Sequence, residues 1–109
     1  MATFEIFRDK SDEFRFRLKA GNGQIILASE GYKAKTGAEN GIASVKTNAP
    51  DDARYGRKES KGGEPYFVLK AKNGEVIGMS EMYSSKTAME TGIDSVKTNA
   101  PIAGVVDQT

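Results

Sequence analysis

The chain contains neither cysteine nor histidine. Without cysteine there are no disulfide bonds and no thiolate chemistry, and thiol usage says nothing about the redox compartment. Without histidine the chain lacks the side chain that most readily exchanges protons near neutral pH, which is also the commonest ligand for zinc, copper and iron. Catalysis would have to use carboxylates, lysine, tyrosine or hydroxyl groups. We therefore expect a protein that is not an enzyme and that uses no cofactor and no metal ion.

A long apolar run and an excess of one charge are missing as well. No stretch approaches the ~20 apolar residues of a membrane span, and the start, Met1 to Glu5, lacks the basic and apolar regions of a signal peptide. The 16 Lys and Arg residues nearly balance the 15 Asp and Glu residues, so no overall field favours nucleic acid or an anionic membrane. We expect a cytoplasmic protein that folds as a single domain over residues 1–109.

The two halves of the chain are copies of one another. Shifting the sequence by 51 positions aligns it with itself without any gap. The matched segments include Leu18-Lys19-Ala20 with Leu69-Lys70-Ala71, Ser29-Glu30 with Ser80-Glu81, and Ser44-Val45-Lys46-Thr47-Asn48-Ala49-Pro50 with Ser95-Val96-Lys97-Thr98-Asn99-Ala100-Pro101. Such a long ungapped match indicates a tandem duplication. We expect repeats at 1–50 and 52–101, followed by a short C-terminal strand and tail at 102–109.

Each repeat begins with strand patterns. Apolar and basic side chains alternate over residues 14–19, which predicts a strand with one buried face and one wet face. Asn22-Gly23 follows and is typical of a type I′ turn, so residues 24–29 should return as the second arm of a hairpin. The second repeat has the same pattern around Asn73-Gly74. A further strand candidate precedes each hairpin, at residues 3–8 and 54–59.

Each repeat continues with a helical pattern. Apolar residues recur every three or four positions, at Ala38, Ile42 and Val45 in the first repeat. Gly41 and its counterpart Gly92 fall in mid-helix, where glycine costs about 1 kcal/mol relative to alanine. Because both repeats keep this glycine, we expect each helix to lie so close to the sheet that a Cβ atom would not fit.

Capping signals bound the predicted helices. Thr36 and Glu39 have the spacing of a capping box, and the second repeat has the same spacing. Asn48 is suited to end the first helix in the left-handed conformation, and Pro50 prevents its continuation. A unit of about fifty residues with one helix has a thin core. The sequence therefore predicts an α+β fold with pseudo-twofold symmetry, in which both repeats share a single antiparallel sheet with the two helices on one face.

Three doubled motifs resemble the YegP-like family of small bacterial proteins of unknown function. They are Leu-Lys-Ala-x-Asn-Gly at 18–23 and 69–74, Ser-Glu-x-Tyr at 29–32 and 80–83, and Gly-Ile-x-Ser-Val-Lys-x-Asn at 41–48 and 92–99. The resemblance extends from Phe4 to Pro101. It implies two strand-strand-strand-helix-strand units in one sheet, with the C-terminal strand of each unit exchanged into the other half. It implies no activity, because the family has none established, so no functional residue is carried over.

The sheet face without helices is the candidate binding surface. Ile25, Leu27 and Val76 should form an exposed apolar strip there, and such strips mark protein contacts more often than catalytic sites. A protein or peptide partner is therefore our first hypothesis, with the protein itself a monomer. The alternative is single-stranded nucleic acid, because basic side chains beside an exposed aromatic recur in sheets that stack bases. The candidate residues are Arg15, Arg17, Lys19, Ile25, Leu27, Tyr66, Val68 and Val76.

Overall fold

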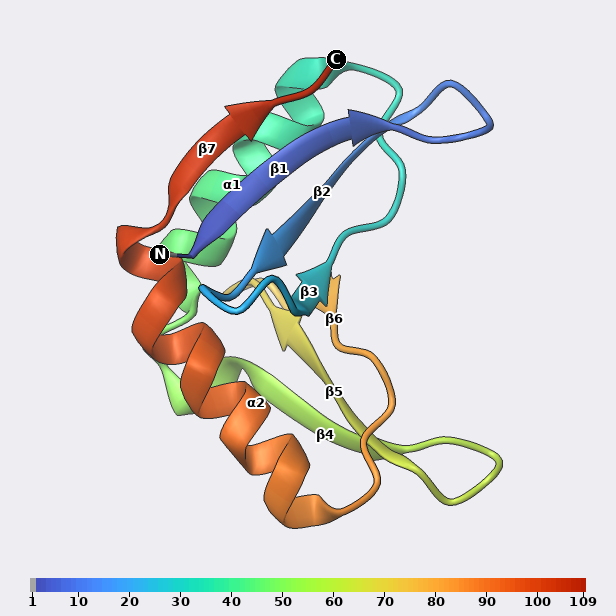
Figure 1. Cartoon of the computed structure of the whole chain (residues 1–109), viewed down its shortest axis with the longest axis vertical. Helices are drawn as coiled ribbons and strands as arrows, with labels where there is room; N and C mark the ends of the chain where they lie inside the picture. Colours follow the sequence, from blue (N-terminus) through green and yellow to red (C-terminus); the bar gives the residue numbers. More distant parts are fainter. Residues whose placement is uncertain (1) are drawn as a thin grey trace.

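The computed structural model of the chain describes residues 2–109 and has the expected α+β fold (Figure 1). One seven-stranded sheet has the order β4-β5-β6-β3-β2-β1-β7. Its strands are β1 (Thr3–Arg8), β2 (Phe14–Lys19), β3 (Ile25–Ala28), β4 (Tyr55–Glu59), β5 (Pro65–Lys70), β6 (Val76–Met79) and β7 (Gly104–Asp107). The helices are α1 (Lys35–Asn48) and α2 (Lys86–Asn99), with short 3-10 helices η1 (Asp52–Arg54) and η2 (Ala100–Ile102). Within the described residues, no helix is long and apolar enough to cross a membrane.

The strand that follows each helix joins the other half of the sheet. β4 follows α1 and pairs with β5 of the second repeat, whereas β7 follows α2 and pairs with β1 of the first repeat. Both helices contact strands of both repeats and lie on the same face of the sheet, at the left of Figure 1. The exchange implied by the family resemblance is therefore present, and it ties the two repeats into one sheet.

The sheet is mixed, whereas the sequence suggested purely antiparallel pairing. β7 runs parallel to β1, with Thr3 opposite Gly104 and Ile6 opposite Asp107. The chain leaves α2 through η2 and reaches the sheet at the end where β1 begins. Since no hairpin joins β7 to β1, the last strand enters in the same direction as β1.

A pseudo-twofold axis passes through the centre of the sheet. β3 and β6 pair antiparallel at Ala28 and Met79, and these two residues are equivalent under the shift of 51 positions. Two equivalent residues that face one another across a pair of strands mark the axis that relates the repeats. The duplicated chain thus has the symmetry of a homodimer whose two subunits are joined in one polypeptide.

The two repeats share one hydrophobic core. Phe4 packs edge-on against Phe16 with the ring centroids 6.0 Å apart, and their counterparts Tyr55 and Phe67 lie 5.8 Å apart. All four belong to one contiguous cluster of buried residues that includes side chains from both helices. Because this cluster spans the axis, neither repeat has a core of its own.

The recurring helix glycines are explained by close packing. A Cβ atom at Gly41 would lie 2.7 Å from Cε2 of Phe16 and 2.9 Å from Oη of Tyr32. A Cβ atom at Gly92 would collide with the ring and hydroxyl of Tyr83. The expectation of a close helix approach is confirmed, and the obstacle at each position is an aromatic ring that the helix covers.

The predicted helix caps are wrong. Both helices begin earlier than the capping-box pattern suggested, so Thr36 and Thr87 fall inside the first turn. Ser85 caps α2 by accepting a hydrogen bond from the N–H of Ala88. At the other end, Ala49 follows Asn48 with right-handed backbone angles, and Nδ2 of Asn48 donates to the carbonyl of Ser44 at 2.8 Å. The asparagines therefore act through their side chains and not through a left-handed backbone.

The hairpin between β2 and β3 is confirmed, but its turn is not type I′. That turn needs positive φ at both central residues, whereas positive φ occurs at Gly23 (85°) and not at Asn22. The N–H of Gly23 donates to the carbonyl of Ala20 at 2.9 Å, and Oδ1 of Asn22 accepts from the N–H of Gln24 at 3.0 Å. The Asn22 side chain thus stabilises a longer loop. In the second repeat Oδ1 of Asn73 accepts from the N–H of Glu75 at 2.9 Å, and Gly74 has positive φ (89°) as Gly23 does.

Candidate functional site

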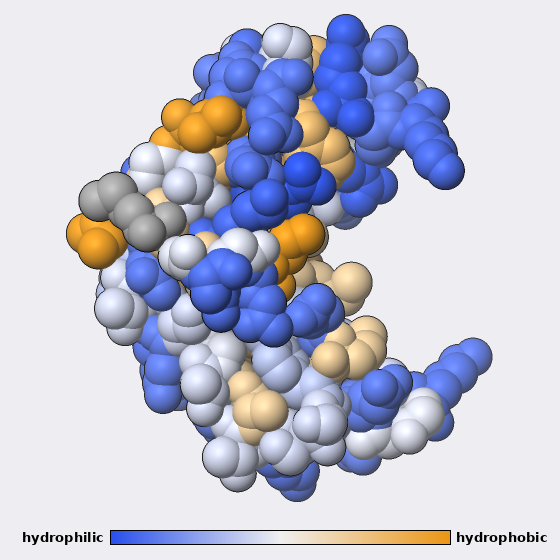
Figure 2. Space-filling view, in the orientation of Figure 1, coloured by the Kyte–Doolittle hydropathy of each residue, from blue (hydrophilic) through white to orange (hydrophobic). Residues whose placement is uncertain are grey.

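The helix-free side of the sheet is hollowed at the pseudo-twofold axis. Figure 2 shows this hollow opening away from the helices, with apolar surface over the central strands at its base. It encloses about 330 Å³, and we call it the axial hollow. It is lined by Arg15, Ala28, Ser29, Glu30, Val76, Ile77, Gly78 and Met79.

Two predicted apolar residues lie exposed on β3 and β6, the strands that meet at the axis. Ile25 is 38% exposed and its counterpart Val76 is 47% exposed. The structure adds Met79 and Met82, which are 48% and 42% exposed and which the sequence reasoning missed. Of these four, Val76 and Met79 both line the axial hollow. An adaptable methionine and a β-branched residue in one hollow are suited to contact with an apolar segment.

Leu27 was expected on the same surface and is instead buried in the core. It is 0% exposed and lies opposite Leu18, whose side chain points toward the helices. A register shift between Leu18 and Lys19 disrupts the simple alternation that led from Ile25 to Leu27. As a result Ala28, and not Leu27, faces the axial hollow.

Val68 and Tyr66 are less accessible than the sequence suggested. Val68 keeps the outward direction of its strand but is only 4% exposed, because it lies between Gly56 and Met79 on the neighbouring strands. Tyr66 is half-buried. The second repeat therefore offers little open aromatic surface for stacking.

The three predicted basic residues are engaged in ion pairs. Nε of Arg15 lies 2.6 Å from Oδ2 of Asp9, and Nε of Arg17 lies 2.7 Å from Oε1 of Glu5. Nζ of Lys19 lies 3.3 Å from the other oxygen of Glu5. Hydrogen bonds from Arg15 and Arg17 hold the pKa of Asp9 and Glu5 below their usual ranges. Arg15, Arg17 and Lys19 are thus neutralised by neighbouring carboxylates and do not form a continuous basic surface.

The two central positions on the core side of the axis are filled unequally. Leu27 and Gly78 are equivalent in sequence, and both point toward the core. A Cβ atom at Gly78 would lie 2.7 Å from Cγ and Cδ2 of Leu27. Two leucines would therefore collide at the axis, and the fold keeps one large residue and one glycine.

The serines of the Ser-Glu-x-Tyr motif have a structural role. Oγ of Ser29 accepts from the N–H of Phe16 at 2.9 Å and donates to the carbonyl of Glu30 at 2.8 Å. Ser80 makes the equivalent bonds to Phe67 and Glu81. These buried hydroxyls bridge the strands beside the axis, and both hydrogen-bonding functions are already used.

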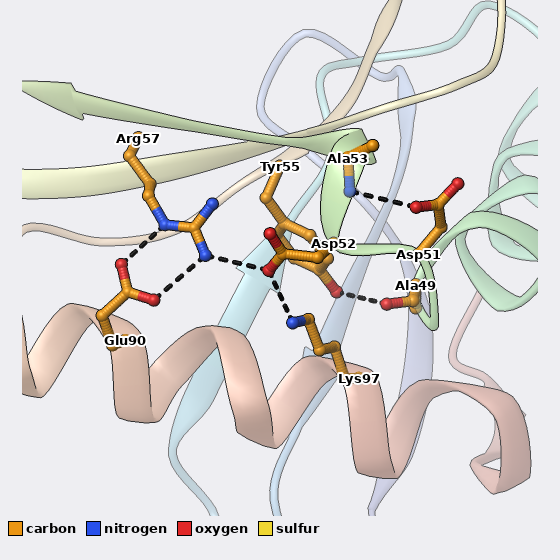
Figure 3. A network of polar contacts seen from close by, with 8 residues as sticks. All are labelled: Ala49, Asp51, Asp52, Ala53, Tyr55, Arg57, Glu90 and Lys97. Atoms are coloured by element: carbon orange, nitrogen blue, oxygen red, sulfur yellow. Dashed lines mark hydrogen bonds and ion pairs between the residues drawn. The ribbon is translucent and has the colours of Figure 1, made fainter.

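An ion-pair network joins β4 to α2 at the other end of the sheet (Figure 3). Asp52 accepts from Lys97 at 2.6 Å and from Arg57 at 3.0 Å, and Arg57 also pairs with both oxygens of Glu90. Hydrogen bonds from Lys97 and Arg57 lower the pKa of Asp52 to about 2. We call these four residues, Asp52, Arg57, Glu90 and Lys97, the edge network.

These pKa shifts do not suit acid-base catalysis. A general base works best with a pKa near the operating pH, whereas the carboxylates of Asp52 and Glu90 are held charged by their cationic partners. Burial raises the pKa of Tyr55, whose hydroxyl donates to the carbonyl of Ala49 at 2.8 Å. Within residues 2–109 there is also no group of three side chains that could hold a metal ion.

Comparison with known proteins agrees with the duplication. Residues 9–55 and 60–107 each match the family described as "Domain of unknown function (DUF1508)". The "UPF0339 protein in ptx operon 5'region" of Stutzerimonas stutzeri is 60% identical over 105 residues, which cover 96% of this chain and 95% of that protein. UPF0339 protein YegP of Escherichia coli is 50% identical over 106 residues, covering 97% and 96% of the two chains.

Solved structures of such relatives share the whole fold. The solution NMR structure of yegP from Escherichia coli, called a protein of unknown function, has a TM-score of 0.94 at 49% identity and covers 99% of this chain and 93% of that chain. A UPF0339 protein from Shewanella oneidensis has a TM-score of 0.92 at 48% identity, covering 97% and 90%. The chain therefore belongs to the DUF1508 family, with one copy of the domain in each repeat, and within it to the UPF0339/YegP proteins.

Proposed function

We propose that this protein is a non-enzymatic binding module whose axial hollow receives an apolar segment of a protein partner. The observation that carries the proposal is that Val76 and Met79 both line the axial hollow and are 47% and 48% exposed. Large apolar side chains exposed together on a helix-free sheet face are a common feature of protein contacts.

The shape of the hollow suits an inserted segment of a partner better than a flat partner surface. Its walls come from both repeats, with Arg15 and Glu30 on one side and Val76 and Met79 on the other. An inserted apolar side chain would contact both walls at once. Its lining combines charged side chains with apolar ones, as protein interfaces do.

The ion pairs favour protein over nucleic acid as the ligand. Binding to nucleic acid depends on cations that neutralise phosphates, but Arg15 and Arg17 would first have to give up Asp9 and Glu5. Tyr66 is half-buried and offers little face for a base to stack on. We therefore place the nucleic-acid hypothesis second.

The proposal is tested by charge substitution in the hollow. We expect Val76→Lys with Met79→Lys, both in the lining of the hollow, to reduce recovery of the bound partner in quantitative affinity capture by at least tenfold, because burying one large apolar side chain is worth about 1.5–3 kcal/mol. The matched control is Ile102→Lys, since Ile102 is 69% exposed but belongs to η2, beside the helices. Equal loss in the control variant, or full recovery with the double variant, would refute the hollow as the binding surface.

A nucleic-acid titration separates the two hypotheses. Single-stranded DNA or RNA at low salt should leave the amide resonances of Arg15, Arg17 and Tyr66 unmoved if the partner is a protein. Salt-dependent shifts at these three residues would instead support the nucleic-acid alternative, because counterion release makes such binding sensitive to salt.

A further inference from the structure

The two outer edges of the sheet differ in what covers them. β7 lies along β1 in the first half, whereas β4 ends the sheet in the second half. An uncovered edge strand presents backbone N–H and C=O groups that can pair with another chain. Because the halves are repeats, the first half shows what kind of segment fits at such an edge.

β7 is held by backbone pairing with β1 and by an ion pair with α1. The strands run parallel with Phe4 opposite Val105 and Ile6 opposite Asp107. The N–H of Gln108 donates to the carbonyl of Ile6 at 2.8 Å. The backbone polar groups of Ile6 therefore point away from β2 and toward β7. Lys35, in the first turn of α1, pairs with the carboxylate of Asp107. The first half thus holds an extended segment with an acidic residue beside a helix lysine.

The second half contains the same parts without the strand. Ile6 lies opposite Phe16, and its counterpart Arg57 lies opposite Phe67. Because the registers are identical, the backbone N–H and C=O of Arg57 point to the open edge. Lys86 is the counterpart of Lys35 and, within residues 2–109, makes no ion pair.

A groove follows this open edge. It encloses about 470 Å³ between the end of β4 and the start of α2, and we call it the β4 groove. The residues that matter here are Arg57, Lys58, Glu59, Pro65, Lys86 and Met89, all of which line it. Its first-half equivalent is the place where the last residues of β7 run past Ile6 and Lys35.

The edge network limits how much of the edge is open. Nζ of Lys46 donates to the carbonyl of Ala103 at the entry to β7, at 2.8 Å. Its counterpart Lys97 is held by Asp52 instead. Asp52 therefore occupies the entry end, and an incoming strand has access to the backbone from Arg57 onward. At that end Lys58 replaces Phe7 of the first half and Glu59 replaces Arg8, so residues 57–59 have the same net charge as residues 6–8. The cation that favours an acidic segment is therefore Lys86, the counterpart of Lys35.

We propose that the β4 groove is a second binding surface, which accepts an extended, acidic segment of another protein as an additional parallel strand. The segment pairs with the backbone of Arg57 and Glu59 and places a carboxylate beside Lys86, as Asp107 does beside Lys35. Main-chain hydrogen bonds supply affinity and the lysine selects the acidic residue, which is the usual division in strand addition. This surface is separate from the axial hollow and does not depend on it.

The test uses a synthetic peptide of residues 104–109, Gly-Val-Val-Asp-Gln-Thr, titrated into the isotopically labelled full chain. We expect saturable amide shifts at Arg57, Glu59 and Lys86. Lys86→Glu should weaken the peptide about three- to tenfold, as should asparagine in place of its aspartate, because a surface ion pair is worth up to about 1 kcal/mol and reversal adds repulsion. Lys72→Glu is the matched control, since Lys72 is exposed in the turn at the other end of β5, and it should leave the affinity unchanged.

Three results would overturn the proposal. Shifts confined to β1 would mean that the peptide only displaces β7. Absence of saturable shifts at millimolar peptide would mean that the edge is closed by its own ion pairs. Concentration-dependent self-association that Glu59→Pro abolishes would mean that a second copy of the chain is the occupant. Glu59→Pro removes an outward-facing N–H at the sheet edge, where proline is tolerated.

Discussion

The two edges of the sheet, one beside each repeat, are built differently. In the first repeat the edge strand β1 is covered by β7, and Ile6 is 2% exposed. In the second repeat the equivalent side chain, Arg57, is 36% exposed and pairs with Asp52 and Glu90. The same position is therefore apolar where a strand covers it and charged where none does. At this edge, therefore, the chemistry of the position follows the neighbour of each copy and not the shared repeat pattern.

A similar inequality occurs at the axis. Equivalent positions approach one another most closely there, so Leu27 and Gly78 cannot both be large. Away from the axis several core counterparts match in size, as Phe16 and Phe67 do. Internal duplication frees the two copies to diverge at such points, which a symmetric dimer of identical chains cannot do.

The largest effect is expected from changing the sizes of the two residues that meet at the axis, Leu27 and Gly78. Leu27→Ala should lower the free energy of unfolding by about 2–5 kcal/mol through the cavity it leaves. Gly78→Ala should lower it by about 1–3 kcal/mol through overpacking against Leu27. In the Leu27→Ala background, however, Gly78→Ala should be neutral or stabilising, because the new methyl group enters the vacated space. Urea unfolding of the four proteins gives the coupling, and simple additivity would contradict the steric explanation.

The next largest effect is expected when Arg57 of the second repeat is replaced by isoleucine, the residue at the equivalent position of the first repeat. Arg57→Ile removes the ion pairs with Asp52 and Glu90 and leaves an apolar side chain on an uncovered strand. We expect concentration-dependent self-association in sedimentation velocity, because exposed apolar edges promote strand pairing between molecules. Arg57→Gln is the matched control, since it removes the charge without adding an apolar surface. Association of both variants would show that the ion pairs, and not polarity, keep the edge from pairing.

The smallest effect concerns the pH dependence of the edge network. The pKa of Asp52 is about 2 in the folded chain against an ordinary value of 3.8. Because the folded pKa is depressed, its contribution to stability is present above pH 3.8 and is lost as pH falls toward 2. The difference in urea midpoint between the natural chain and Asp52→Asn should therefore be largest above about pH 4 and close by about pH 2.

A control variant sharpens that measurement. Glu81→Gln removes a carboxylate that is exposed in the loop after β6 and, within residues 2–109, has no ion pair. It should show no comparable pH-dependent difference in midpoint. If the difference in urea midpoint between Asp52→Asn and the natural chain stays constant from pH 6 to pH 2, the effect of the substitution does not come from the ion pairs.

Local pattern predicted the elements well and their details less well. The alternation around Phe16 and the helical stripe through Ile42 are encoded by neighbouring residues, so strands, helices and the duplication could be recognised. Thr36 had the spacing of a cap, yet α1 begins one residue before it. Helix ends depend on how the preceding chain leaves the sheet, which spacing alone does not contain.

The candidate site was predictable only where no register shift intervenes. Ile25 and Val76 lie exposed as expected, because they come at the start of their strands. Leu27 was misplaced because the shift beside Leu18 depends on the loop that joins the strands. Met79 was missed for the same reason, since strict alternation from Val76 would not point it outward.

The sequence by itself determined the repeat, the order of strands and helices, and which side of β2 is basic, because each of these is written in residues close together along the chain. Only the tertiary structure decided that Arg17 is neutralised by Glu5, that Leu27 excludes a side chain at position 78, and that β7 runs parallel to β1. These features join residues far apart in the chain, so they depend on how the two copies pack and not on the pattern within either copy.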